Sequence, residues 1–255
     1  MNPVTVRNVR IGEGIPKICV PIVGKTRTKI REAGENIRDI GADIIEWRAD
    51  WYEDVFLPER VEETAKELRE VLGDMPLLFT FRTAKEGGVR QIGKDAYVRL
   101  NQNMARTGYI DMADVEMFTG EDAVREVIRT AHAFEVKVVV SNHDFHGTPS
   151  KEEMVARLRR MQEMGADIPK IAVMPRDKKD VLALLAATEE MYSEYADRPV
   201  ITMSMDKTGV VSRLCGEVFG SAVTFGSAGK ASAPGQVETE ELRRVLKLLH
   251  GIIEG

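Results

Sequence analysis

Lys170 stands at the head of an apolar run, residues 171–174, that two prolines bracket. Burial disfavours an ammonium group, whose pKa is ordinarily near 10.4, because it removes the water that stabilises the charge. A buried lysine is tolerated mainly where its neutral amine attacks a carbonyl carbon or where a carboxylate pairs with it. Two interpretations follow: a Schiff-base nucleophile toward a ketone or aldehyde, and an ion pair with Glu46, Glu86 or Glu116.

Polar side chains also follow several other apolar runs. Glu46 and Arg48 share one side of a predicted strand, so they are either site residues or a buried ion pair. Arg82 either faces the site or holds a carboxylate at the end of the sheet. Further candidates at such ends are Lys85, Glu86, Asn142, His143, His146, Ser204, Met205 and Arg213, and a loop of small residues adds Lys230, Ser232 and Gln236.

One pair of histidines has a spacing that permits metal binding. His143 and His146 are three residues apart in a predicted loop. A protein zinc site takes three or four ligands, and no third histidine or cysteine lies near this pair in the sequence. We therefore expect no metal.

Eight short apolar runs, with helical stretches between them, must position these groups. The runs begin 22 to 34 residues apart, the rhythm of strand–helix units around a parallel sheet. Eight such units in about 250 residues are typical of a (β/α)8 barrel, an α/β fold with its reactive groups at the carboxyl ends of the strands. An open doubly wound sheet is the alternative, but no glycine-rich phosphate loop follows an early run. The predicted strands are 17–23, 43–47, 77–82, 110–116, 136–141, 170–173, 200–204 and 222–225.

The first residues and the composition complete the predicted organisation. Residues 1–16 alternate apolar and polar side chains, and they predict a hairpin that covers the barrel floor. No linker rich in proline, glycine or serine divides residues 1–255, so a single domain is expected. The net charge of −5 has no basic block, which argues against a nucleic-acid partner.

Three further features bear on where the protein works. No apolar run approaches the roughly 20 residues of a membrane helix. The amino terminus lacks the apolar stretch of a secretory signal. Cys19 and Cys215 are the only cysteines and lie in apolar segments, which fits two reduced thiols in the cytoplasm.

Six segments of the chain stand out as motifs: IIEWR (44–48), LLFTFRTAKEGG (77–88), SNHDFHGTP (141–149), MQEMGADIPKIAVMP (161–175), ITMSMDKTGVVSRLCGEVFGSAVTFG (201–226) and KASAPGQ (230–236). They resemble segments of type I 3-dehydroquinate dehydratases, and the resemblance runs nearly from end to end. It implies a (β/α)8 barrel of the shikimate pathway that removes water from 3-dehydroquinate to give 3-dehydroshikimate. It also implies no metal, no organic cofactor and, usually, a homodimer.

The resemblance also implies roles for individual residues. Lys170 matches the lysine that forms an imine with the substrate ketone. His143 matches the general base and acid, and Glu86 the carboxylate that orients this histidine. Arg213 matches the residue that pairs with the substrate carboxylate. The residues that match contacts to the ring hydroxyls, or that close over them, are Glu46, Arg48, Arg82, Ser232 and Gln236.

Some expectations remain open beside this resemblance. Pro21 stands where close relatives often carry serine, so one hydroxyl contact to substrate is lost. The loop 226–236 is predicted to close over the ligand, with a plain connecting loop or a phosphate cradle as alternatives. A Schiff-base aldolase and a barrel that only binds a ligand are the competing functions. The combination of Lys170, His143 and Glu86 argues against the second.

Overall fold

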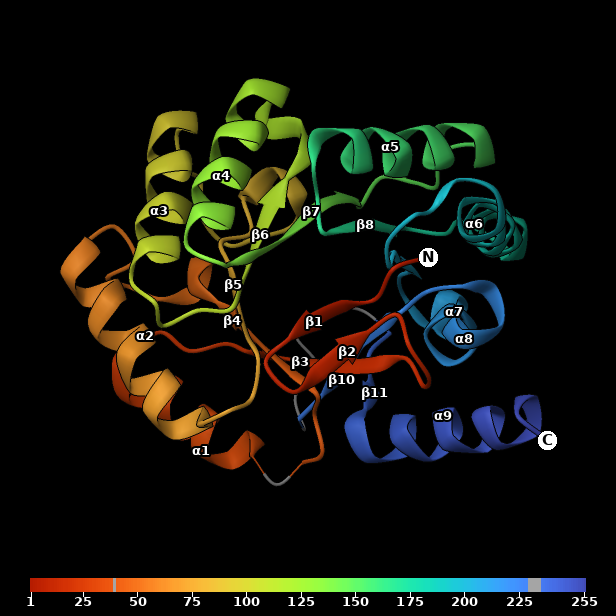
Figure 1. Ribbon diagram of the computed structural model, residues 1–255, viewed down its shortest axis with the longest axis horizontal. Coiled ribbons are helices and arrows are strands. Elements are labelled where there is room, and N and C mark those ends of the chain that lie inside the picture. Colours follow the sequence, from red (N-terminus) through yellow and green to blue (C-terminus); the bar gives the residue numbers. More distant parts are fainter. Residues whose placement is uncertain (39, 229–234) are drawn as a thin grey trace.

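The structure is a computed structural model that describes residues 1–38, 40–228 and 235–255. Parallel strands β3 to β10 follow one another in chain order around a curled sheet, and β10 lies beside β3 (Figure 1). This order makes a TIM-barrel-like α/β fold rather than an open doubly wound sheet. The strands are β3 (Lys17–Ile22), β4 (Ile44–Arg48), β5 (Leu77–Thr80), β6 (Met112–Glu116), β7 (Lys137–Asp144), β8 (Ile168–Val173), β9 (Ile201–Ser204) and β10 (Val223–Ser227). The predicted fold class and its eight strands are confirmed.

The ring closes between β9 and β10 with less pairing than elsewhere. A single parallel bridge joins Val200 to Ser221. The amide of Ala222 donates to the carbonyl of Val200 at 2.9 Å, and the amide of Thr202 donates to the Ser221 hydroxyl at 3.0 Å. A short strand β11 (Val237–Glu238) pairs in parallel with the carboxyl-terminal end of β10.

Helices surround the strands, and their apolar sides cover the outer face of the sheet (Figure 1). In the described residues no helix is both long enough and apolar enough to cross a membrane. The helices are α1 (Arg27–Ile37), α2 (Pro58–Leu72), α3 (Lys94–Arg106), α4 (Glu121–Ala133), α5 (Lys151–Met164), α6 (Lys178–Glu190), α7 (Val210–Leu214), α8 (Gly216–Phe219) and α9 (Thr239–Ile253).

Alternation along the strands separates two kinds of core. In β4, Ile45 and Trp47 pack outward against the helices, whereas Ile44 belongs to a second cluster inside the barrel. Successive side chains of a strand point to opposite faces, so Glu46 and Arg48 face inward with Ile44. In β4 to β8 an apolar inner residue near the start of the strand is followed by polar inner residues, whereas Met203 in β9 and Phe225 in β10 keep those inner positions apolar. This gradient places the polar groups at the carboxyl ends.

An antiparallel hairpin precedes the barrel, as the sequence predicted. It consists of β1 (Val4–Val6) and β2 (Val9–Ile11), with Val6 opposite Val9. Val6 and Ile11 are buried in the same cluster as the first inner residues of the barrel strands. The hairpin thus packs against the amino-terminal end of the barrel interior and leaves the carboxyl ends free.

Three aspartates at the amino-terminal end connect strands in pairs. Asp43, Asp111 and Asp167 each stand one residue before an even-numbered strand. Their carboxylates accept hydrogen bonds from backbone amides in the preceding strand, at Ile18 (2.7 Å), Leu77 (2.8 Å) and Val138 (2.8 Å). The amide of each aspartate donates in return to the carbonyl of the same residue, so the start of each pair is bonded in both directions.

Candidate active site

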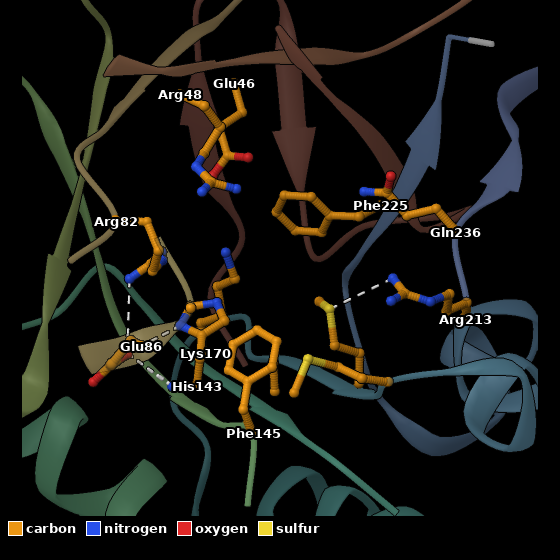
Figure 2. Close-up of a pocket in the computed structure, with 14 residues that line it drawn as sticks. Glu46, Arg48, Arg82, Glu86, His143, Phe145, Lys170, Arg213, Phe225 and Gln236 are labelled. Carbon is orange, nitrogen blue, oxygen red and sulfur yellow. Dashed lines mark hydrogen bonds and ion pairs between the residues drawn. The ribbon is translucent and has the colours of Figure 1, made fainter. Parts of the chain in front are cut away.

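A cavity of about 130 Å³ opens at the carboxyl ends of the barrel strands (Figure 2). It brings together eight of the nine predicted site residues, which come from strands and loops far apart in the sequence. Ser232, the ninth, lies outside the described residues. The cavity is lined by Glu46, Arg48, Arg82, Glu86, Gly87, His143, Phe145, Lys170, Ala172, Met203, Met205, Arg213, Phe225 and Gln236.

Lys170 projects from β8 into this cavity and is only 2% exposed. Its Nζ atom lies 3.5 Å from a carboxylate oxygen of Asp114. It also lies 4.3 Å from the centre of the Phe225 ring, a distance at which the ring face attracts a cation. Lys170 therefore has a carboxylate partner, as one of its two sequence interpretations required. That partner is Asp114 and not one of the three glutamates that were proposed.

Asp114 is the main residue that the sequence interpretation missed. It is fully buried in β6, where it accepts a hydrogen bond from Ser141 at 2.6 Å and pairs with Arg82 at 2.8 Å. Burial alone would raise its pKa, but the charges of Arg82 and Lys170 hold the pKa of Asp114 below its usual value. The alternation of β6, which also turns Glu116 inward, was the available signal.

Arg82 stands at the centre of a buried group of charges. Its guanidinium pairs with Asp114 and with Glu116 (3.0 Å), and lies 3.8 Å from Glu86. It also donates to the Ser141 hydroxyl at 3.0 Å. Burial opposes its charge, but these carboxylates raise the pKa of Arg82 well above its ordinary value. The alternative role, that of holding carboxylates, is therefore present in the structure.

His143 and Glu86 form a hydrogen-bonded pair on the cavity wall (Figure 2). The Oε2 atom of Glu86 accepts from the His143 amide at 2.8 Å and lies 3.1 Å from Nδ1 of the ring. Burial, together with the cations Arg82 and Lys170, lowers the pKa of His143 well below its usual value. Burial raises the pKa of Glu86 to about 8, an effect that Arg82 opposes and Glu116 strengthens. Both shifts favour uncharged side chains near neutral pH.

Glu46 and Arg48 do not pair with each other, so the proposed ion pair between them is wrong. Glu46 accepts a hydrogen bond from Thr80 at 2.9 Å. Arg48 donates through two nitrogens to the two oxygens of Asp50, at 2.8 and 2.9 Å. Glu46 and Arg48 both line the cavity, but each is held by a different hydrogen-bond partner.

Arg213 approaches the cavity from the opposite side (Figure 2). It is 2% exposed and extends from α7, where its Nη1 atom lies 3.6 Å from the sulfur of Met203. Burial lowers its pKa to about 10, so the guanidinium remains charged at neutral pH. Arg213 and Lys170 thus present positive charge to one cavity from two sides.

Several candidates take no part in the cavity lining. Asn142 points away from it and binds Arg157 at 2.9 Å, and the main chain of Ser204 binds the Ser212 hydroxyl. Lys85, His146 and Pro21 also do not line it. No group of three or more potential metal ligands occurs in the described parts of the chain. Lys230 and most of the predicted closing loop lie outside those parts.

The fold and the cavity together define a class of protein. A TIM-barrel-like sheet with a buried lysine, a histidine–carboxylate pair and cationic side chains around one cavity at its carboxyl ends is a barrel enzyme. A family model described as "Type I 3-dehydroquinase" matches residues 18–253. The chain belongs to this family.

Individual relatives agree with this assignment. The chain is 56% identical over 247 residues to a 3-dehydroquinate dehydratase of Clostridioides difficile, covering 97% of each sequence. It is 58% identical over 250 residues to one of Listeria welshimeri, covering 98% of this chain and 99% of the relative. The crystal structure of a Clostridium difficile type I enzyme with covalent modified comenic acid is similar, with a TM-score of 0.97, 55% identity and coverage of 99% and 100%.

Proposed function

We propose that this enzyme dehydrates 3-dehydroquinate to 3-dehydroshikimate through a Schiff base on Lys170. Membership of the type I 3-dehydroquinase family supports the reaction, which belongs to the shikimate pathway. The observation that carries the mechanism is the position of Lys170, buried at the base of the cavity and facing His143 (Figure 2). A relative of nearly the same fold holds covalent modified comenic acid, which supports a nucleophile in such a protein.

The chemistry begins at the substrate ketone. The ammonium group of Lys170 gives up one proton and the resulting neutral amine attacks C3. That proton leaves with the carbonyl oxygen in a water molecule, and a protonated imine forms. The imine nitrogen then accepts the electron pair of the C2–H bond as His143 removes that proton. His143 returns the proton to the C1 hydroxyl, which departs as water while the double bond forms. Hydrolysis of the imine releases the product and restores the amine.

The surroundings of Lys170 suit this sequence of charges. A protonated imine has the same positive charge as the ammonium it replaces. Asp114, at 3.5 Å, and the ring face of Phe225 therefore stabilise the cation before and after the imine forms. We propose that Asp114 remains ionised throughout, because Arg82 also holds its charge.

His143 has the properties of a base that alternates with an acid. Its lowered pKa leaves the ring uncharged and able to accept a proton near neutral pH. Glu86 fixes the ring through Nδ1 and the His143 backbone through its amide. The Glu86 oxygen that lies beside Nδ1 then stabilises the positive charge that proton uptake gives the His143 ring.

The remaining cavity residues are proposed to hold the substrate. Arg213 is proposed to pair with the substrate carboxylate, and Glu46, Arg48 and Gln236 are proposed to bind the ring hydroxyls, because all four line the cavity. The guanidinium of Arg82 already forms ion pairs with Asp114 and Glu116. Arg82 is therefore proposed to act chiefly through the effect of its charge on the cavity.

Borohydride reduction in the presence of 3-dehydroquinate tests the mechanism. Peptide mass mapping should find the reduced adduct on Lys170, and Lys170→Ala should remove it while Lys85→Ala, at a lysine outside the cavity, should not. His143→Ala should still form the adduct, whereas product formation should fall by about a hundredfold or more. An adduct at another lysine, or none, contradicts the mechanism.

The assembly and organisation of the protein are also proposals. We propose one domain for residues 1–255, a homodimer and a cytoplasmic location, where the free thiols Cys19 and Cys215 would stay reduced. A single unfolding transition and light scattering during gel filtration test the first two.

A further inference from the structure

Asp50 is a buried carboxylate beside the cavity to which no role has yet been assigned. It lies in the short 3-10 helix η1 (Ala49–Trp51) directly after β4, and it is 0% exposed. It is not among the residues that line the cavity. A buried carboxylate is costly unless its oxygens receive hydrogen bonds, so its partners reveal what it supports.

The first partner is Arg48. The Nε and Nη2 atoms of Arg48 donate to Oδ1 and Oδ2 of Asp50, at 2.8 and 2.9 Å. A bidentate pair of this kind fixes the plane of the guanidinium as well as its position. Glu46, the nearest cavity carboxylate on the same strand, bonds to Thr80 instead. The orientation of Arg48 in the cavity therefore depends on Asp50.

The second set of partners belongs to the segment 82–90, which follows β5 and includes Glu86. The backbone amides of Arg82 and Val89 donate to the two Asp50 oxygens, at 3.4 and 3.2 Å. Arg90 donates through Nε to the carbonyl of Asp50 at 3.0 Å. Both ends of the segment are thus bonded to one residue, and Glu86 lies between them.

We propose that Asp50 is a positioning residue that holds Arg48 and the Glu86 segment in one fixed geometry. The contacts of Asp50 with Arg48 and those with the segment 82–90 are proposed to support different parts of the reaction. Arg48 is proposed to bind substrate, whereas Glu86 orients the base His143. The proposal rests on the proposed function, since it assigns Asp50 to the same reaction.

Asp50→Asn tests the proposal because the amide keeps the shape but replaces one acceptor oxygen with a donor. KM should rise about tenfold as Arg48 loses its fixed plane, and kcat should fall severalfold as Glu86 shifts. The pH profile of kcat should move, because Glu86 contacts the ring of His143, the proposed base. In an Arg48→Ala background, Asp50→Asn should leave KM unchanged and still lower kcat.

Asp111→Asn is the matched control. Asp111 also pairs with an arginine, Arg69 at 2.6 Å, and accepts from a backbone amide, that of Leu77, but at the opposite end of the barrel. This variant should lose stability with KM, kcat and pH profile unchanged. If Asp50→Asn behaves in the same way, or if its effect on KM multiplies with that of Arg48→Ala, the proposal is wrong.

Arg90→Ala provides a second test should Asp50→Asn not fold. It removes the side-chain contact to the Asp50 carbonyl and leaves the Arg48 pair intact, so kcat should fall while KM stays within about twofold. An unchanged kcat and an unchanged pH profile would contradict the proposal that Asp50 holds the segment 82–90 in place. Borohydride trapping on Lys170 is scored separately. If trapping fails in the wild type, the Schiff-base mechanism fails, whereas the KM and kcat comparison still decides the role of Asp50.

Discussion

Replacing Glu86 by glutamine should make the protein more stable in mildly alkaline solution. Burial raises the pKa of Glu86 to about 8 from its ordinary value of 4.5. At a pH between these two values the unfolded chain has lost the proton that the folded chain keeps. The free energy of unfolding therefore falls as pH rises through this window, and it levels off above about pH 8. Glutamine carries no titrating proton and removes this loss.

The magnitude follows from the two pKa values. The linkage relation gives a cost of about 2 kcal/mol at pH 6 and about 4 kcal/mol at pH 8, so about 2 kcal/mol develops between them. Glutamine loses part of the hydrogen bonding of Oε2 with the His143 amide and ring, which costs about 1–2 kcal/mol. The net gain at pH 8 should be about 2 kcal/mol.

Urea unfolding at pH 6 and pH 8 measures this difference. The wild type should lose about 2 kcal/mol relative to Glu86→Gln between the two conditions. Glu70→Gln, at an exposed site on α2, should follow the wild type at both pH values. Parallel curves for the wild type and Glu86→Gln would show that the folded protein does not hold a proton on this carboxyl group.

Three further substitutions test the barrel and its cavity. Ile11→Ala, in the fully buried hairpin position, should lower the free energy of unfolding by about 2–5 kcal/mol in urea titrations, with KM little changed. Arg213→Gln should raise KM more than it lowers kcat in steady-state assays, because a charge facing the cavity is lost. Gly88→Ala should reduce both kcat and melting temperature, since a Cβ atom there would lie 1.9 Å from the Arg82 carbonyl oxygen, whereas Gly93→Ala, with no heavy atom within 4 Å, should change neither.

The sequence was sufficient for the barrel because each strand is a short apolar run with turn and helix signals around it. The largest error in a strand end is three residues, at β7, which was predicted as 136–141 and extends over Lys137–Asp144. Lys170 could be found because a cation in an apolar run is itself the signal. The long motifs then identified the family.

The partners of these residues could not be predicted in the same way. Asp114 lies in β6 and Lys170 in β8, so the two strands are separated by β7. Which inner side chains meet across a barrel depends on the stagger between strands, which no local pattern specifies. Asp50 was missed for a related reason. Its partners Arg82 and Val89 are 32 and 39 residues away and use backbone amides, which carry no sequence signature.

The three aspartates at the amino-terminal end of the barrel, Asp43, Asp111 and Asp167, also help to determine which side chains face the cavity. A shift of one residue between paired strands would turn every inner side chain outward, so that Asp114 would lie among the helices. The same shift would move Asp111 away from Leu77, whose amide and carbonyl make the two hydrogen bonds at the start of that pair. Mispairing is therefore penalised by the loss of these hydrogen bonds, at the end of the barrel remote from the cavity. The last pair, β9 and β10, has Ala222 at the corresponding position and lacks this carboxylate. Three strand pairs thus have a register-setting carboxylate of their own, whereas the register of the final seam depends on the strands beside it.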